Sequence, residues 1–241
     1  MLNTGRKRSS YISQKRERHR LWRFCAFLLV LFFLYNIITA FFFSVWGLHN
    51  NTMQPNLQAG DRFVVISAAL PQMLAGLRQS DAQFKRGQIV LIDTTRGEGR
   101  PWILRAFDSL VRFFTAQQLS IFGSQEHLYI KRLVALPGDE ITMNNFVLRI
   151  RPADNSHAFT EFELAERPYH PNIPQVPALW DEALPFSGNM DWITLGPGEC
   201  FVISDDRSNT SDSRTWGPIS TRHIIGRPIF RFWPPARMGR P

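Results

Sequence analysis

The chain has 241 residues and a formal net charge of +8 at pH 7. Residues 1–23 hold eight basic residues and one acidic residue, which leaves twenty basic and nineteen acidic residues in the remainder. The body of the chain is therefore close to neutral, and its composition gives no reason to expect a nucleic-acid partner. The length is sufficient for one membrane anchor and one or two small domains with a hydrophobic core.

An uncharged apolar segment follows the basic arm. Residues 24–43 read FCAFLLVLFFLYNIITAFFF, and the next charged residue after Arg23 is Asp61. Twenty such residues in a helix span roughly the 30 Å hydrocarbon core of a bilayer. The flanking positive charge predicts a single-pass anchor with a cytoplasmic N-terminus and an exported body. The alternatives are a cleaved signal peptide, whose apolar region is shorter, and a buried core helix.

The two cysteines, Cys25 and Cys200, fall on opposite sides of this predicted topology, so no disulfide between them is expected. The sequence contains no CxxC, HExxH or glycine-rich phosphate-binding motif. No metal and no cofactor is therefore predicted.

Short runs rich in Val, Ile and Phe, bounded by Gly, Pro and Asp clusters, predict strands in the exported body. Their spacing indicates a mainly β, antiparallel fold rather than βαβ units. The predicted strands cover residues 62–67, 88–92, 128–136, 146–150, 200–204 and 224–233.

Two segments depart from this pattern. Residues 101–122 have apolar positions every three or four residues with charges between them, which predicts an amphipathic helix, packed on the body or lying on the membrane surface. Residues 151–194 are proline-rich and poor in strand pattern, and are expected to form an irregular insertion or cap. The predicted organisation is a cytoplasmic arm at 1–23, an anchor helix at 24–45 and a domain at 46–241, with insertions at 96–127 and 148–194.

Lysine is rare in the exported body, where it occurs only at Lys85 and Lys131. Arginine keeps its proton at any accessible pH, whereas a desolvated lysine loses its proton more readily. A buried neutral Lys131 could act as general base for a hydroxyl nucleophile. The alternative for any single lysine is a solvated strand residue.

Three ordered stretches resemble bacterial type I signal peptidases, the membrane-anchored proteases that remove signal peptides. They are HNNTMQPNLQAGD at 49–61, YIKRLVALPGD at 129–139 and SDDRSNTSDSRTWG at 204–217. The first is similar to the family's Ser-Met-x-Pro-x-Leu-x-x-Gly-Asp motif and the second to its lysine motif. The resemblance implies a signal-peptidase-like antiparallel β domain behind an N-terminal transmembrane helix.

The sequence departs from the family's pattern at six positions, namely Asn50, Asn51, Thr52, Ser204, Asp206 and Thr210. Thr52 stands at the position of the nucleophilic serine and Thr210 at that of the serine whose hydroxyl orients the lysine. Each replacement keeps a hydroxyl, although threonine adds a methyl that restricts χ1. The side-chain amide of Asn50 can donate to an oxyanion. Asn51 replaces a glycine, a change that matters only if the position requires a positive φ.

The resemblance implies that Lys131 takes the proton from Thr52 while Asn50 and the Thr52 backbone N–H hold the oxyanion. Residues near Met53 and Pro55 would contribute to shallow pockets for small substrate side chains. We expect a structural ion-pair cluster behind the lysine, formed by Asp212, Arg214 and Arg132. These residues would hold the fold without taking part in the chemistry.

The implied localisation is the bacterial cytoplasmic membrane, and the implied partners are preprotein signal peptides and membrane lipid, with the secretion translocon a further candidate. Two other hypotheses stay open. A catalytically inactive relative would bind signal peptides, or regulate an active enzyme, without cutting. An anchor or sheath protein with a basic tail would explain the topology but not the three motifs.

Overall fold

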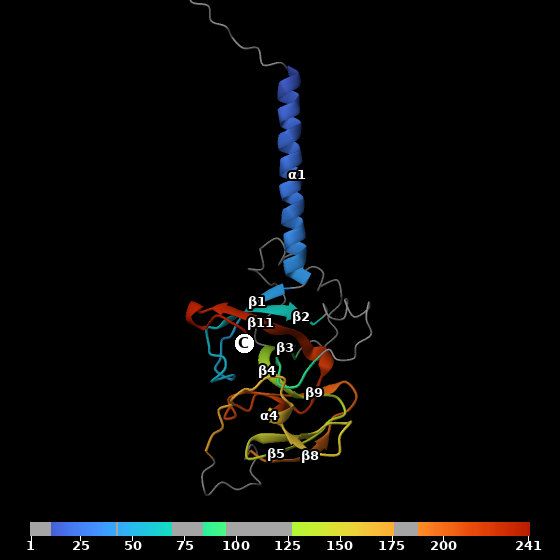
Figure 1. Cartoon of the computed structure of the whole chain (residues 1–241), viewed down its shortest axis with the longest axis vertical. Coiled ribbons are helices and arrows are strands. Elements are labelled where there is room, and N and C mark those ends of the chain that lie inside the picture. Colours follow the sequence, from blue (N-terminus) through green and yellow to red (C-terminus); the bar gives the residue numbers. More distant parts are fainter. Residues whose placement is uncertain (1–10, 42, 69–83, 95–126, 176–187) are drawn as a thin grey trace, which may run out of the picture.

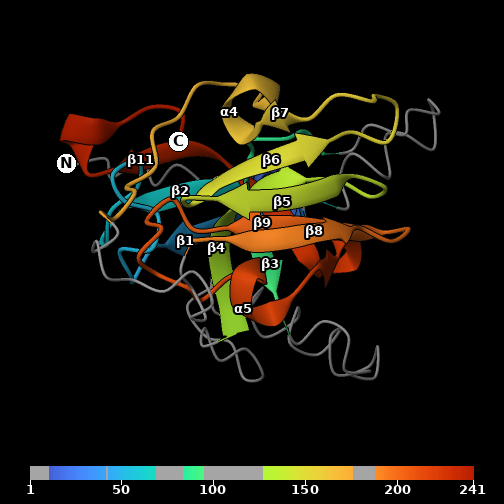
Figure 2. The same cartoon turned by 90° about the horizontal axis from the view of Figure 1, so that it is seen from below.

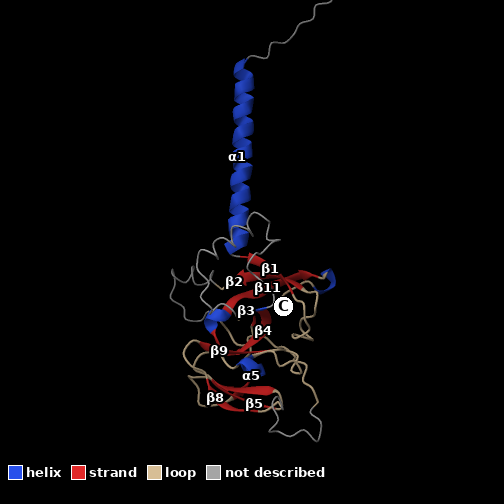
Figure 3. Ribbon diagram, turned by 180° about the vertical axis from the view of Figure 1, so that it is seen from behind, coloured by secondary structure: helices blue, strands red, loops and turns tan. Residues whose placement is uncertain are grey.

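The computed structural model describes residues 11–41, 43–68, 84–94, 127–175 and 188–241. Strands make up most of the body, with short helices at its edges (Figure 3). This agrees with the predicted mainly β, antiparallel class. The amphipathic helix predicted over 101–122 lies outside the described residues.

The long helix α1 (Tyr11–Phe41) runs from within the predicted basic arm through most of the predicted anchor. Its 31 residues correspond to a length of about 46 Å. Figure 1 shows α1 projecting from the β body and leading directly into strand β1 (Phe43–Gly47). Within the described part of the chain, no helix combines the length and apolar character needed to cross a membrane.

A seven-stranded antiparallel sheet forms the half of the body next to α1, with strands in the order β1-β2-β11-β3-β4-β9-β10. The six predicted strands are all present, five of them in this sheet. Its remaining members are β2 (Arg62–Ser67), β3 (Ile89–Asp93), β4 (Leu128–Ala135), β9 (Glu199–Ile203), β10 (Ile219–Ser220) and β11 (Ile224–Trp233).

A second, four-stranded sheet lies at the end of the body away from α1, as the view from below in Figure 2 shows. Its order is β7-β6-β5-β8, with β5 (Glu140–Asn144), β6 (Val147–Arg151), β7 (Phe159–Thr160) and β8 (Met190–Thr194). The expectation that 151–194 is irregular throughout is therefore wrong: β7 and β8 lie there. Both were missed because one strand has two residues and the other mixes Asp and Thr with its apolar positions.

Short helices complete the body. Helix α4 (Glu161–Leu164) begins with a capping box in which Thr160 and Glu163 satisfy each other's backbone N–H groups. Helix α5 (Ser213–Trp216) is capped by the Asp212 side chain, which accepts from the Arg214 N–H. The 3₁₀ turns η2 (Thr221–His223) and η3 (Pro235–Arg237) flank β11.

The two sheets share one buried core. Val134, Ala135, Phe201 and Ile203 of the seven-stranded sheet pack against apolar residues of the four-stranded sheet and its connections: Ile141, Met143, Leu148, Ile150 and Leu195. Strands β4 and β9 are thus buried on the face toward the second sheet. The other face of β4 is buried as well. Leu133 packs there with Val90 and Val202 in a separate cluster, and Lys131, two residues before Leu133, lies on the same face.

Candidate active site

Lys131 lies in the middle of β4 and is fully buried. It is paired in register with Val90 of β3. Its Nζ donates a hydrogen bond to Ser204 Oγ at 2.8 Å and lies 6.0 Å from the centre of the Trp216 ring. The solvated-strand alternative is therefore wrong, because the amine has lost its contact with bulk water.

Burial lowers the pKa of Lys131 to about 8 from the model-compound value of 10.5. The Asp212 carboxylate acts in the opposite direction, and the positive charge of Arg214 adds to the lowering. Asp212 is itself paired with Arg214, at 2.8 Å between Oδ2 and Nη2. That pairing offsets the carboxylate that raises the pKa most, and with a pKa of about 8 roughly a tenth of Lys131 is neutral at pH 7, the form that a general base requires.

Thr52 lies in the loop between β1 and β2 and is 7% exposed. Leu48 N donates to Asp61 O and Gly60 N to Leu48 O, both at 2.8 Å, so that the two ends of the loop are joined. Met53 and Leu57 are fully buried in a cluster with apolar residues of β2, β3 and β4. Burying each of these side chains stabilises the loop by roughly 1.5–3 kcal/mol.

The Thr52 hydroxyl donates to Asn50 Oδ1 at 3.0 Å. Asn50, predicted to hold the oxyanion, therefore lies beside the predicted nucleophile. The positive-φ residues other than glycine in the described chain are Asn145 and Phe146. Asn51 thus replaces the family's glycine without backbone strain, and its Oδ1 accepts from Ala59 N at 3.1 Å.

The stretch after β9 connects the two predicted catalytic residues. Ser204 bonds the Lys131 amine, and two residues later Asp206 N donates to Thr52 O at 3.0 Å. Between them, Asp205 Oδ2 accepts from Asn56 Nδ2 at 2.8 Å. The residues that contact Lys131 and Thr52, Ser204 and Asp206, are two positions apart in the chain. Their Cα atoms are therefore separated by about 7 Å at most.

The described hydrogen bonds of Thr210 do not reach Lys131. The hydrogen bond of the Lys131 amine goes to Ser204, while the Thr210 carbonyl accepts from Asp212 N and from the Thr215 hydroxyl. The expectation that the Thr210 hydroxyl orients the lysine has no support in these contacts.

The predicted ion-pair cluster is divided between two pairs. Arg214 binds both carboxylate oxygens of Asp212, with Nε–Oδ1 at 3.0 Å and Nη2–Oδ2 at 2.8 Å. Arg132 instead binds Asp205, with Nε–Oδ1 and Nη2–Oδ2 both at 2.6 Å. The guanidinium of Arg132 also lies 3.9 Å from the centre of the Tyr169 ring. Both pairs are bidentate and buried, as expected for a structural role.

A third buried pair was not predicted from the sequence. Arg207 Nη2 donates to Glu161 Oε2 at 2.6 Å, and the Tyr169 hydroxyl donates to the same oxygen at 2.5 Å. Glu161 Oε1 accepts from Leu148 N at 3.1 Å. These contacts join the segment containing α4 to the motif around Asp205. Nothing in the pattern of residues 151–194 indicated that a glutamate there would be buried.

A pocket of about 320 Å³ has Asn50 in its lining, but neither Thr52 nor Lys131. It is lined by residues 46–50, Leu91 and residues 128–130, and so includes Asn50 and ends one residue before Lys131. Met53 is buried within the loop cluster, and Pro55 is exposed. Neither belongs to this lining, and their predicted part in substrate binding stays a prediction.

A family model described as "Signal peptidase, peptidase S26" matches residues 21–233. The chain is 25% identical over 225 residues to signal peptidase I of Bacillus caldolyticus, covering 92% of this chain and 94% of that protein. It is 29% identical over 112 residues to the probable signal peptidase I-1 of Synechocystis sp., covering 46% of each.

A further relative is the chloroplastic thylakoidal processing peptidase 1 of Arabidopsis thaliana, 27% identical over 115 residues, which cover 48% of this chain and 27% of the relative. The chain thus spans less than half the length of these last two relatives. The chain belongs to the peptidase S26 family of signal peptidases.

Proposed function

We propose that this chain is a membrane-anchored endopeptidase that removes signal peptides, with Thr52 as nucleophile and Lys131 as general base. The observation that carries the proposal is the complete burial of Lys131, whose pKa is lowered to about 8. A buried amine hydrogen-bonded to a hydroxyl, and paired with no carboxylate among the described ion pairs, is arranged for proton transfer.

The first chemical step moves the Thr52 hydroxyl proton to Lys131 Nζ as Oγ1 attacks the scissile carbonyl. Because that hydroxyl donates to Asn50 in the resting structure, it must turn toward Lys131 when substrate binds. The protonated amine then gives its proton to the leaving nitrogen, and the C–N bond breaks to leave an ester on Thr52. Lys131 next takes a proton from the water that attacks the ester, and returns it to Thr52.

The oxyanion would be held by the Thr52 backbone N–H and by the Asn50 side-chain amide. Rotation of the amide brings Nδ2, in place of Oδ1, toward the reacting carbonyl. The hydrogen bond that Asn50 makes in the resting state is thereby exchanged for one formed during the reaction, which is the condition for catalysis.

The substrate would bind in extended form along a strand edge near the membrane surface. An extended peptide can add to such an edge through backbone hydrogen bonds. The pocket beyond β1 is lined largely by apolar side chains, including Trp46, Leu48, Leu128 and Ile130, and suits small side chains preceding the scissile bond. Met53 would support this site from the core beneath it.

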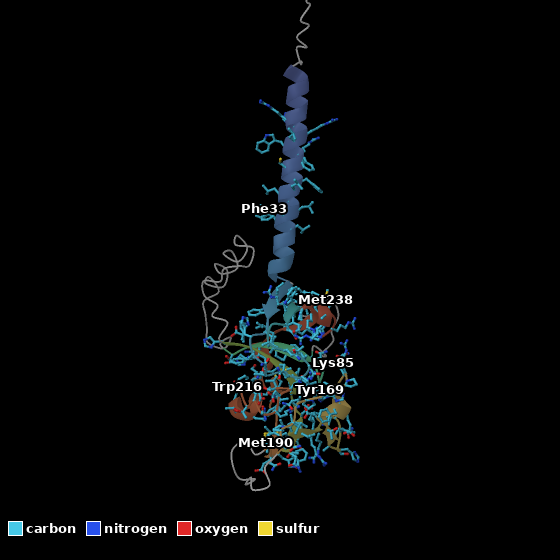
Figure 4. All side chains as sticks on the ribbon, turned by 90° about the vertical axis from the view of Figure 1, so that its left-hand side faces the viewer. Phe33, Lys85, Tyr169, Met190, Trp216 and Met238 are labelled. Carbon is cyan, nitrogen blue, oxygen red and sulfur yellow. The ribbon has the colours of Figure 1, made fainter. Side chains whose placement is uncertain are left out.

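Helix α1 would be the anchor. Its described side chains from 18 to 34 are exposed, and large apolar residues predominate among them from Leu21 onward. Phe33, labelled in Figure 4, stands on the helix well away from the β body. Placing these residues in lipid would remove apolar surface from water and keep the basic arm in the cytoplasm. A chain that leaves the membrane pellet on alkaline carbonate washing would contradict this.

The second candidate function is a non-cutting binder of signal peptides. It is favoured by one observation, the hydrogen bond from the Thr52 hydroxyl to Asn50 Oδ1 rather than to Lys131. Such a protein would keep the pocket and the buried lysine but would not form the ester. The added methyl of Thr52 would then prevent the rotation that attack requires.

The deciding experiment is cleavage of a purified preprotein by the detergent-solubilised chain, beside the variants Thr52→Ser, Thr52→Val and Lys131→Met. Thr52→Val is the matched control, because valine keeps the shape of threonine and lacks the hydroxyl. The proposal expects cutting by the native chain, undiminished cutting by Thr52→Ser, and a loss of at least a thousandfold in the other two variants.

Each alternative result has a distinct meaning. If the native chain and Thr52→Val are equally inert while Thr52→Ser cuts, the protein is a binder built on an intact catalytic scaffold. Cutting that survives in Lys131→Met would exclude Lys131 as the base. An ester trapped on Thr52 and identified by mass spectrometry would establish the nucleophile directly.

A further inference from the structure

The Lys131 amine has a hydrogen-bond partner, Ser204, at one of the six positions where the sequence departs from the family's pattern. Ser204 follows β9 directly, and its Oγ accepts from Lys131 Nζ at 2.8 Å. Both residues are fully buried. A neutral amine has two N–H donors and one lone pair, so donating one N–H to a fixed oxygen restricts rotation about the Cε–Nζ bond. The lone pair can then be aimed at a nucleophile.

Ser204 is itself held in place. Its backbone N–H donates to Asp212 Oδ2 at 2.8 Å, and Arg214 holds that carboxylate on the other side. The next residue, Asp205, is fixed by the bidentate bond from Arg132. Because the backbone around Ser204 is bonded on both sides, its hydroxyl presents a preorganised acceptor to the lysine.

We propose that Ser204 is the positioning residue of Lys131 and supplies the orienting hydroxyl expected from Thr210. This inference rests on the proposed peptidase function and adds to it the group that directs the base. A residue without a side-chain acceptor at 204 could not accept from the amine, and the described hydrogen bonds of Thr210 go through its carbonyl.

The first measurement compares cleavage by Ser204→Ala, Thr210→Ala and Ser208→Ala. Ser208 is the matched control, since it lies in the same motif, is exposed, and donates its hydroxyl to Asp206. Ser204→Ala should lower kcat by about tenfold to a hundredfold with little change in KM, because a misdirected base affects chemistry more than binding. Thr210→Ala should have a smaller effect, and Ser208→Ala should have none.

The second measurement is independent of cleavage. The chain has four lysines, Lys7, Lys15, Lys85 and Lys131, so NMR of labelled lysine side chains can follow Lys131 alone once Lys131→Met identifies its signal. Removing the acceptor disfavours the ammonium form more than the amine. The titration midpoint should therefore fall by about half a unit to one unit in Ser204→Ala, and stay in place in Ser208→Ala.

The two measurements separate the two proposals. A native chain that does not cut, with a Lys131 midpoint that still responds to Ser204→Ala, overturns the peptidase function and supports the contact. Unchanged kcat and an unchanged midpoint in Ser204→Ala overturn the role of Ser204, as does a larger loss of kcat in Thr210→Ala. If Ser204→Ala is unstable, Ser204→Cys replaces it, and its weaker acceptor should give an intermediate loss of kcat.

Discussion

Lys131 and Arg132 are neighbours on β4 and point to opposite faces of the strand. Figure 4 shows their aromatic contacts, Trp216 and Tyr169, on opposite sides of the body. Arg132 is bound by both oxygens of Asp205 and by Gly87 O, whereas the lysine amine meets a single hydroxyl.

The two neighbours differ in whether their charge is paired: Arg132 has a carboxylate partner and stays charged, whereas Lys131 has none among the described residues and loses its proton more readily. The buried guanidinium of Arg132 has the Asp205 carboxylate within hydrogen-bond distance, and that of Arg207 has the Glu161 carboxylate. Around Lys131, the carboxylate that raises its pKa most, Asp212, is bound by Arg214. The protein therefore stabilises the charged form on one face and the neutral form on the other. Methionine substitutions at these adjacent positions should have opposite effects on stability.

Arg132→Met should produce the largest loss of stability. It would leave the fully buried Asp205 carboxylate with Asn56 as its remaining side-chain donor and no cation. Removing one member of a buried pair costs about 3–5 kcal/mol, which urea unfolding monitored by tryptophan fluorescence would measure.

The double variant Arg132→Met/Asp205→Asn is the control for this prediction. It removes the stranded charge and should recover part of the lost free energy. If Arg132→Met alone unfolds at the same urea concentration as the native chain, the Arg132–Asp205 pair does not hold the motif in place.

Lys131→Met should have a smaller effect of opposite sign at neutral pH. The pKa of Lys131 is about 8 in the folded chain and 10.5 in a model compound, so the unfolded chain binds more protons between these values. Native stability should therefore rise from about pH 8 to 10.5, and below this window the lysine costs about 3 kcal/mol. Lys131→Met should remove that cost together with the rise.

The matched control is Lys85→Met. Lys85 is an exposed lysine paired with Glu166 at 2.6 Å, and its loss should leave the pH dependence of unfolding unchanged. Parallel stability curves for the native chain and Lys131→Met between pH 7 and 10 would show that the lysine is not held neutral by burial.

Local sequence patterns were sufficient to predict most strands of the larger sheet and to single out Lys131. The six predicted strands were found because Val, Ile and Phe recur between Gly, Pro and Asp clusters, and Lys131 stood out because lysine is rare in the body. The second sheet was largely missed because its strands are short and gain their stability from packing against β4 and β9. Such tertiary stabilisation leaves little trace in local periodicity.

The sequence predicted one site containing Thr52, Asn50 and Lys131. In the structure Ser204 contacts the Lys131 amine and Asp206 N donates to Thr52 O, while the catalytic roles stay a prediction. The partner of Arg132 and the hydroxyl beside Lys131 depend on which side chains β9 and its following turn bring to β4. Spacing along the chain does not determine such contacts, since Asp205 and Asp212 were equally plausible partners for an arginine.

Substitution of Arg214 should give the smallest of these effects, a change in the pKa of Lys131. Its charge lowers the pKa of Lys131, and its bonds to Asp212 restrain a carboxylate that raises it. In Arg214→Gln both influences act in one direction, and the pKa of Lys131 should rise. Under the proposed mechanism the acid limb of kcat/KM would move to higher pH, with a loss of roughly threefold to tenfold at pH 7.

Arg214→Lys separates charge from geometry in this prediction, because it keeps the positive charge and loses the planar fork. If the field of Arg214 is what matters, the acid limb of Arg214→Lys should stay close to that of the native chain while Arg214→Gln shifts. Equal shifts in the two variants would instead assign the effect to the bidentate hold on Asp212. That hold also fixes the Ser204 N–H, so an equal shift should come with the same fall in kcat that Ser204→Ala shows.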